Sequence, residues 1–438
     1  MSVTVGIATL GEDPPMLRKV VDAALRSVER TGGEVLVIAN GGARVEMPGT
    51  RVIHREERGL AFARNLILDE ALHDTVLFTD GDCLVPPDWC STMAAALADH
   101  VMVTGPVRMI VEGPVTAFFD YQRLFDSTPA GPAGPPLIIT ANSGLRRDRL
   151  PGGLRFATGF STAGEDTYFG LQLADAGIDV KYLQGATPIR HALSESITEL
   201  TNRYLRNART GPKLFLEYGR GEAAMPDALT FYRRRTSPDF PMERRFAEVA
   251  DPRARAAFAV FHTILSDLTL VGYLDGLGTL MGHPLVTIDH EGLDAEWARI
   301  GTAVDELTVG ITADEWANLD IDVRRIGNPV PGQPIQAWVR AALRRNAPAI
   351  PTDPTGPVAD VLAYAGANRV ATFVAYQSLV RGAWAKLRAK TEPVGPDVAE
   401  RVTRPLGVAL SAACDVAELL VAIDNSIERR RALARAAR

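Results

Sequence analysis

The sequence predicts an α/β domain, with a mostly parallel sheet flanked by helices, followed by a mainly α-helical domain. Over the first 220 residues, short apolar runs alternate with segments whose apolar residues recur at helical spacing. Beyond residue 220, strand signals become rare, and helical patterns rich in alanine, leucine and arginine dominate. A chain of 438 residues is also too long for one ordinary hydrophobic core. We therefore expect two domains, residues 1–225 and residues 226–438.

The alternation in the N-terminal part predicts each element in turn. Strands are expected at Val3–Ile7, Glu34–Ile38, Arg51–His54, Thr75–Thr79, Leu137–Thr140 and Val180–Leu183. Helices are expected at Pro14–Glu29, Gly59–Leu72, Asp88–Asp99 and Thr167–Ala176. This β-α-β-α order favours parallel strands with helices on both faces of the sheet. The segment Thr128–Pro136 is rich in proline and glycine, so we expect a loop, which either closes over a substrate or is a plain surface excursion.

The composition is that of an ordinary globular protein, with 46% hydrophobic and 23% charged residues. A formal net charge of −6 argues against a nucleic-acid-binding protein. Three cysteines do not suggest a disulfide framework, and we expect a cytoplasmic location. No signal peptide is apparent, and no transmembrane span is expected, because the most apolar segment, residues 256–281, is interrupted by charged residues.

The triplet Asp80-Gly81-Asp82 follows the predicted strand Thr75–Thr79 and is the first candidate site. Carboxylates at the carboxyl end of a central strand reach the crevice where open α/β sheets bind ligands. Buried carboxylates are costly unless they are paired or bind a cation, and Mg²⁺ or Mn²⁺ suits them. Asp82 is expected to bind the cation directly, with Asp80 nearer a ribose or a metal-bound water. An acidic pair after a strand is otherwise a turn or a helix cap.

Three later residues complete the candidate site. Asp166 stands at the start of a predicted helix and is the candidate general base, which would take a proton from an acceptor hydroxyl. Glu165 beside it would hold the acceptor or support the base. His191 would complete the metal site or contact a diphosphate. Acidic residues also favour a helix N-terminus through the helix dipole, and a lone histidine is more often a packing or surface residue.

The order of these motifs resembles the inverting family 2 glycosyltransferases of the GT-A fold. Residues 3–9 look like the opening strand and nucleotide loop of that family, and residues 35–42 look like its second strand and turn. Residues 59–65 are similar to its Gly-x-x-x-Ala-Arg-Asn helix, and residues 78–83 match its Asp-x-Asp segment. Residues 140–144 and 164–166 look like its acceptor-side strand and its catalytic acidic motif. The resemblance covers roughly residues 1–215.

The resemblance implies a role for each matched residue. Asp80 and Asp82 would serve the nucleotide and the metal, with His191 as a metal or diphosphate ligand. Asp166 would be the base of a single displacement that inverts the anomeric carbon. Arg64 would hold the nucleotide, or else form an ion pair on the helix surface. Asn40 stands where the family usually carries an acidic residue that reads the base, and Thr9 is expected to help there.

We therefore expect a transferase that moves a sugar from a nucleotide diphospho-sugar, UDP-linked, to a small-molecule or glycoconjugate hydroxyl. Processive members of the family carry a Gln-x-x-Arg-Trp motif and membrane helices. Both are absent from this sequence, which favours one transfer over polymer synthesis. The helical domain would cover the acceptor cleft or form a homodimer. Alternatives are a sugar-phosphate nucleotidyltransferase, a non-catalytic nucleotide-sugar-binding or scaffolding protein, and transfer to a peptide side chain. The glycine-rich loop of nucleotidyltransferases is missing after the first strand.

Overall fold

Seven strands form the main sheet in the computed structural model of this protein, in the order β3-β2-β1-β4-β8-β6-β9. The structure describes residues 2–213, apart from 12, 41–43, 58, 123–124, 126, 128–137, 161–162 and 211–212. It also describes isolated positions between 249 and 279, and residues 290–319. The chain divides into two compact units, one of residues 1–111 and 119–194 and the other of residues 112–118 and 195–438. The predicted domain boundary at residue 225 lies outside the described residues and stays a prediction.

The sheet of the first unit is mostly parallel, as predicted. β1, β2, β3 and β4 pair in parallel, whereas β8 runs antiparallel to both of its neighbours. The strands are β1 (Val3–Thr9), β2 (Gly33–Asn40), β3 (Arg51–Arg55), β4 (Thr75–Asp80), β6 (Met102–Thr104), β8 (Ser143–Arg146) and β9 (Val180–Tyr182). A second sheet of three strands, in the order β5-β10-β7, consists of β5 (Cys83–Leu84), β7 (Val107–Met109) and β10 (Ile189–His191).

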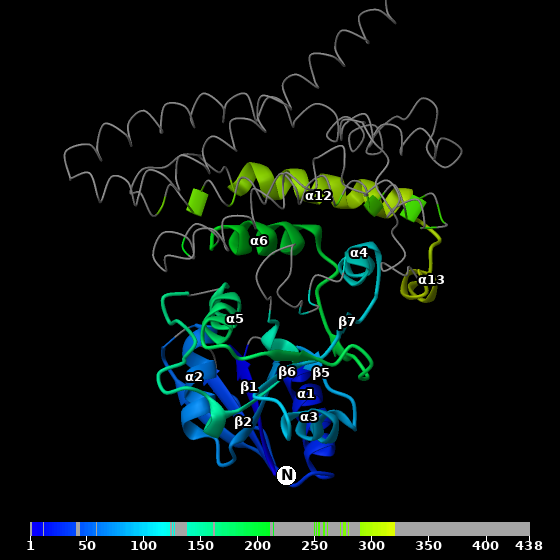
Figure 1. The fold of residues 1–438 in the computed structure, drawn as a ribbon. Helices are drawn as coiled ribbons and strands as arrows, with labels where there is room; N and C mark the ends of the chain where they lie inside the picture. The colour runs from blue at the N-terminus through cyan, green and yellow to red at the C-terminus, as the bar shows by residue number, and fades with distance from the viewer. Residues whose placement is uncertain are drawn as a thin grey trace, which may run out of the picture. The chain divides into compact units, whose positions relative to one another are not determined.

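Helices cover both faces of the main sheet. α2 (Leu60–Glu70) and α5 (Glu165–Asp175) lie on one side, and α1 (Pro14–Val28) and α3 (Trp89–Leu97) lie on the other (Figure 1). α1 begins where the sequence signals a start, because Asp13 accepts a hydrogen bond from the amide of Met16 and proline follows it. Buried apolar side chains of α2 and α5 pack against those of β2 and β4, including Ile38, Ile67, Phe78 and Phe169. This core holds the two helices firmly on the sheet.

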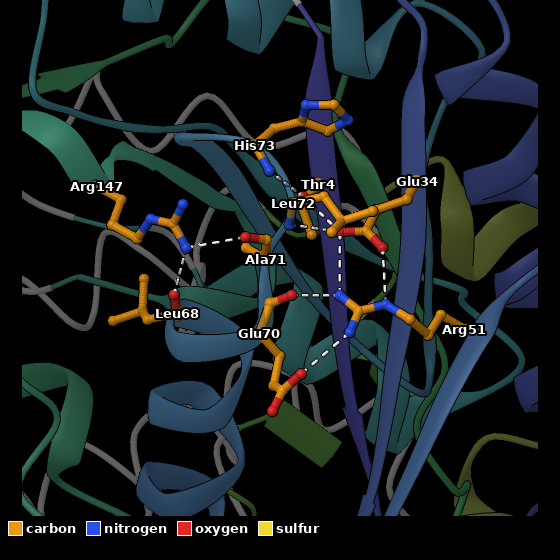
Figure 2. Close-up of polar contacts among 9 residues, drawn as sticks. All are labelled: Thr4, Glu34, Arg51, Leu68, Glu70, Ala71, Leu72, His73 and Arg147. Carbon is orange, nitrogen blue, oxygen red and sulfur yellow. Dashed lines mark hydrogen bonds and ion pairs between the residues drawn. The ribbon is translucent and has the colours of Figure 1, made fainter.

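The C-terminal end of α2 is held by two arginines from outside the helix (Figure 2). The guanidinium of Arg147 donates to the carbonyls of Leu68 and Ala71, at 2.8 and 2.9 Å. Arg51 donates to the carbonyl of Glu70 and to its carboxylate. The last carbonyls of a helix have no partners within the helix, so these cations satisfy them and complement the negative end of the helix dipole. The anchored helix carries Arg64 of the candidate site.

The described part of the second unit is helical. Its helices are α6 (Ile197–Ala208), α12 (His290–Leu307) and α13 (Ala313–Ala317), and α6 packs against α12. α4 (Pro114–Gln122) begins in this unit, where Phe118 meets the rings of Phe258 and Phe261 edge to face. Among the described residues, no helix is both long and apolar enough to cross a membrane. Most of the apolar segment 256–281 falls outside them.

One predicted strand is wrong. Residues 138–139 are extended chain without strand pairing, and Thr140–Asn142 form a 3₁₀ turn, η1, before β8 begins at Ser143; a second turn, η2 (Arg147–Arg149), follows β8. The run at 137–140 looks like a strand because it is apolar, but Ile138 is buried by packing into the core and not by strand pairing. The predicted loop at Thr128–Pro136 lies outside the described residues. The three strands of the second sheet were not predicted, since two or three residues show no periodicity.

Candidate active site

The candidate site lies at the carboxyl ends of β1 and β4. The chain order of strands reverses between these two, because β2 and β3 lie on the far side of β1, and open α/β sheets bind ligands at such a switch point. Asp80 ends β4, and Asp82 follows in the turn before β5. Gly81 lets this turn pass close to Thr9, since an added Cβ would lie 3.0 Å from the Thr9 hydroxyl. Thr9 therefore lies directly beside the acidic turn.

Three side chains at this turn form a cluster of possible metal ligands. The ligand atoms of Asp82, Cys83 and His191 all lie within 4.8 Å of one another. His191 Nε2 is 3.0 Å from Asp82 Oδ2, and Cys83 Sγ is 3.5 Å from Asp82 Oδ1. His191 is buried, and the ring of Phe125 meets its imidazole edge to face, with 4.7 Å between the ring centroids. The structure thus brings together two predicted metal ligands, Asp82 and His191, and adds Cys83.

Strand pairing brings His191 to this turn. His191 ends β10, whose antiparallel pairing with β5 sets this residue opposite Cys83. The amide of Ala192 donates to the carbonyl of Asp82 at 2.9 Å, which extends the pairing by one residue. The pairing joins positions more than a hundred residues apart, so the spacing along the chain does not reveal it.

Asp80 forms an ion pair with Arg64. The Nη2 atom of Arg64 is 3.2 Å from Asp80 Oδ1, and its Nη1 atom pairs with the carboxylate of Glu165. Burial works to lower the pKa of Arg64, but the charges of Asp80, Glu165 and Asp166 outweigh it and raise that pKa. Arg64 is 3% exposed and stays positively charged, so it is not a surface ion pair. It ties the acidic turn of β4 to the N-terminus of α5.

The two acidic residues of α5 have different environments. Gly164 takes a left-handed conformation, φ 96°, that turns the chain into the helix. Glu165 is 2% exposed, and among the described residues its Oε2 atom has no hydrogen-bond partner. Asp166 Oδ1 accepts the amide of Thr167 at 2.8 Å. Burial, and then the negative charge of Glu165, raise the pKa of Asp166 to about 7.

A carboxylate with a pKa near neutrality suits a general base, because it exchanges protons readily at neutral pH. Burial also raises the pKa of Asp80, although the charge of Arg64 opposes this. Three carboxyl groups, those of Asp80, Glu165 and Asp166, thus act on one buried arginine. The arrangement can accept a further cation and can take a proton at Asp166.

Asn40, which is predicted to contact a nucleotide base, uses its side chain for local contacts with the backbone. Its side-chain nitrogen donates to the carbonyls of Glu57 and Gly59, at 3.2 and 3.0 Å. Asn40 is buried at the end of β2, and these bonds fix the chain that leads into α2. The hydroxyl of Thr9 likewise accepts a local bond, from the amide of Gly11 at 3.0 Å. The predicted contacts of Asn40 and Thr9 with a nucleotide stay predictions.

Sequence reasoning missed Cys83 and Asn65. Cys83 is adjacent to the acidic pair in the sequence, and that adjacency was the available signal for it. Asn65 follows Arg64 on α2, and its side chain exchanges two hydrogen bonds with the backbone of Phe156, at 2.8 and 2.9 Å. Asn65 thus holds Phe156 beside α2, as Arg64 holds Glu165. No signal in the sequence identifies the partner of Asn65.

Comparison with known proteins gives one family match. Residues 4–146 match the family model described as glycosyl transferase family 2. A search of curated proteins found no match. Among solved structures, the chain is similar to S. aureus TarS 1–349 in complex with UDP, at 14% sequence identity. That similarity covers 65% of this chain and 92% of the other, with a TM-score of 0.35.

The matched residues span the switch point of the sheet and the acidic turn after β4. The fold, with a mostly parallel sheet flanked by helices and an acidic pair at its carboxyl edge, agrees with the GT-A type that the resemblance implied. Residues 4–146 of this chain are therefore a family 2 glycosyltransferase domain.

Proposed function

We propose that this protein is a metal-dependent, inverting glycosyltransferase, which moves a sugar from a UDP-linked donor to a hydroxyl of a small molecule or glycoconjugate. One observation carries the proposal. Asp166, whose pKa is about 7, is linked through Glu165, Arg64 and Asp80 to the turn that bears Asp82. A basic group for the acceptor and a cation-binding group for the donor thus belong to one connected cluster.

The donor half of the proposal rests on the chemistry of the acidic turn. A nucleoside diphosphate carries negative charge that grows as the glycosidic bond breaks, and a bound Mg²⁺ or Mn²⁺ would neutralise part of it. Asp82 and His191 fit such an ion, because a carboxylate oxygen and an imidazole nitrogen face each other at 3.0 Å. Asp80 stays beside Arg64 and would contact the ribose or a water on the ion. Thr9 and Asn40 lie at neighbouring strand ends, where the nucleoside would bind.

The acceptor half rests on α5. Asp166 would take the proton of the acceptor hydroxyl while the acceptor oxygen forms its bond to the anomeric carbon. The bond from that carbon to the diphosphate breaks in the same step, so the configuration inverts. Glu165 Oε2 is buried and has no partner among the described residues, which leaves it able to accept a hydrogen bond from the acceptor. The negative charge of Glu165 also helps to keep the base strong enough for this task.

Several parts of the proposal go beyond the acidic cluster. A cytoplasmic location rests on the low cysteine content, and a homodimer through the C-terminal region rests on its helical sequence pattern.

Transfer to a peptide side chain would use the same base and donor site. A non-catalytic protein would not need an acidic residue of raised pKa near a buried arginine, so that alternative is the second candidate. A nucleotidyltransferase would release pyrophosphate from a nucleoside triphosphate and a sugar phosphate.

The test uses the whole chain with a panel of nucleotide sugars, with and without Mn²⁺. We expect UDP-sugars with Mn²⁺ to raise the melting temperature, since a ligand that binds the folded form stabilises it. Asp82→Ala should abolish this metal-dependent shift. Asp166→Asn should keep the shift and lower donor turnover by about 10²-fold or more. Wild-type protein that binds donors but never hydrolyses or transfers them would contradict the proposal and favour the binding protein.

A further inference from the structure

Cys83 occupies a place in the candidate metal site that no part of the proposed function uses. It lies directly opposite His191 in the antiparallel pair of β5 and β10, and side chains directly opposite in such a pair share one face of the sheet. Asp82 precedes it and reaches the same point from the turn. The three side chains offer sulfur, nitrogen and oxygen ligands from two strands and one turn.

The spacing of these atoms fits a bound cation. A metal ion with a sulfur ligand at about 2.3 Å and an oxygen ligand at about 2.1 Å holds the two ligand atoms about 3.6 Å apart in tetrahedral geometry. Cys83 Sγ and Asp82 Oδ1 are 3.5 Å apart. His191 provides a second, independent sign of a ligand. It is 2% exposed, and its Nε2 atom, 3.0 Å from Asp82 Oδ2, presents a buried imidazole nitrogen to the cluster.

We propose that Cys83 is a direct metal ligand together with Asp82 and His191, and that its sulfur makes the site prefer Mn²⁺ and later first-row ions over Mg²⁺. The inference rests on the proposed function, since it concerns the same donor-binding ion. Sulfur and imidazole favour softer ions, and affinity generally rises from Mn²⁺ through Co²⁺, whereas Mg²⁺ prefers oxygen ligands alone. On binding, a bond from sulfur to the metal replaces the S–H bond, and the proton passes to solvent.

A second buried cysteine provides the matched control. Cys90 is fully buried on α3, as Cys83 is on β5. The amide of Cys90 bonds to the hydroxyl of Ser27 on α1, and Cys90 does not belong to the ligand cluster found among the described residues. Burial alone therefore does not separate the two thiols, but proximity to Asp82 and His191 does. Cys414 is present in every variant and cancels from each comparison.

The experiment loads wild type, Cys83→Ser and Cys90→Ser with Co²⁺ and records near-ultraviolet absorption. A sulfur-to-cobalt charge-transfer band is expected in wild type and in Cys90→Ser, and it should be absent in Cys83→Ser. Titration calorimetry with Mn²⁺ and Mg²⁺ supplies the second readout. The ratio of the Mg²⁺ to the Mn²⁺ dissociation constant should fall by about tenfold or more in Cys83→Ser, because loss of a ligand should cost at least as much as loss of a group that supports one.

Wild-type protein that binds Co²⁺ without a charge-transfer band would overturn the inference, and so would a Cys83→Ser variant that keeps the band. If Cys83→Ser does not fold, X-ray absorption of Co²⁺-loaded wild type decides, since a shell without sulfur overturns the inference. The proposed function has its own readout. Mn²⁺-dependent sugar transfer without a sulfur ligand would refute only the role of Cys83. A wild-type protein that binds neither metal nor donor would refute the metal dependence and the role of Cys83 together.

Discussion

The guanidinium of Arg64 donates to the carboxylate of Glu165, which stands 101 residues later in the chain, and both side chains are buried. The same guanidinium also holds Asp80, at 3.2 Å. Arg64 thus fixes the distance between the end of β4 and the start of α5. In the proposed reaction, these two places carry the donor and the acceptor. The stability of the fold and the geometry of the proposed site therefore depend on one side chain.

Replacing Arg64 by methionine is expected to lower the free energy of unfolding by about 3–5 kcal/mol, because Glu165 would stay buried without its charged partner. Urea denaturation of the whole chain measures the change. The matched control is Arg155→Met, which removes an ion pair to Asp69 whose two side chains are 47% and 56% exposed. An exposed pair of that kind contributes about 0–1 kcal/mol. Equal effects of the two substitutions would contradict the structural role of Arg64.

The double variant Arg64→Met with Glu165→Gln should be more stable than Arg64→Met alone, since the glutamine removes the uncompensated charge. A double-mutant cycle isolates this coupling. Transfer activity should stay low in both variants, because the link between β4 and α5 is lost in each. If Glu165→Gln fails to recover any stability, the two side chains do not interact as the structure indicates.

Asp166 should make the transfer rate depend on pH near neutrality. Its pKa of about 7 means that the ionised base becomes more abundant as the pH rises through this value. The rate constant kcat of the wild type should therefore rise from pH 5.5 to pH 8, over roughly one unit either side of about 7, and then level off. Asp166→Asn should lose that rise along with about 10²-fold or more of the rate. Asp179→Asn, at an exposed position, is the control and should keep the wild-type profile.

The same carboxyl group should make folding less stable at higher pH. The folded-state pKa of Asp166 is raised from 3.8 to about 7, so the folded protein holds this proton more tightly than the unfolded chain. Its contribution is complete below the unfolded-state value and is lost as the pH rises through about 7. Asp166→Asn should therefore raise the melting temperature relative to wild type at pH 8 more than at pH 5. A constant difference across this range would contradict the raised pKa.

Asn65 should act by positioning the chain before Glu165. Asn65→Ala leaves the backbone amide and carbonyl of Phe156 without their partners, at an expected cost of about 1–3 kcal/mol in the free energy of unfolding. The displaced segment should lower kcat while donor affinity, measured by calorimetry, stays near that of wild type. Asn202→Ala, at an exposed position on α6, is the control for an asparagine in a helix. Donor affinity that falls as far as kcat would argue against a role confined to the acceptor side.

Glu34 should make the fold sensitive to acid. Burial works to raise its pKa, but hydrogen bonds from Arg51, from the amide of Leu72 and from Thr4 outweigh it and lower that pKa below 4.5 (Figure 2). Its contribution to stability is present above the unfolded-state value and is lost as the pH falls through the folded-state value. Glu34→Gln should thus flatten the loss of melting temperature below about pH 4.5. Exposed Glu29→Gln serves as the comparison and should leave the acid dependence unchanged.

The sequence by itself determined the α/β order, the parallel strands and the acidic pair at the end of β4, because these follow from local periodicity and turn chemistry. It also determined that Asp166 lies in the first turn of a helix. Only the tertiary structure decided that Cys83 lies opposite His191, that Arg64 joins Asp80 to Glu165, and that Asn65 holds Phe156. The physical reason is that each of these contacts joins side chains from separate elements, and strand pairing and helix packing, which leave no local pattern in the sequence, set their distances.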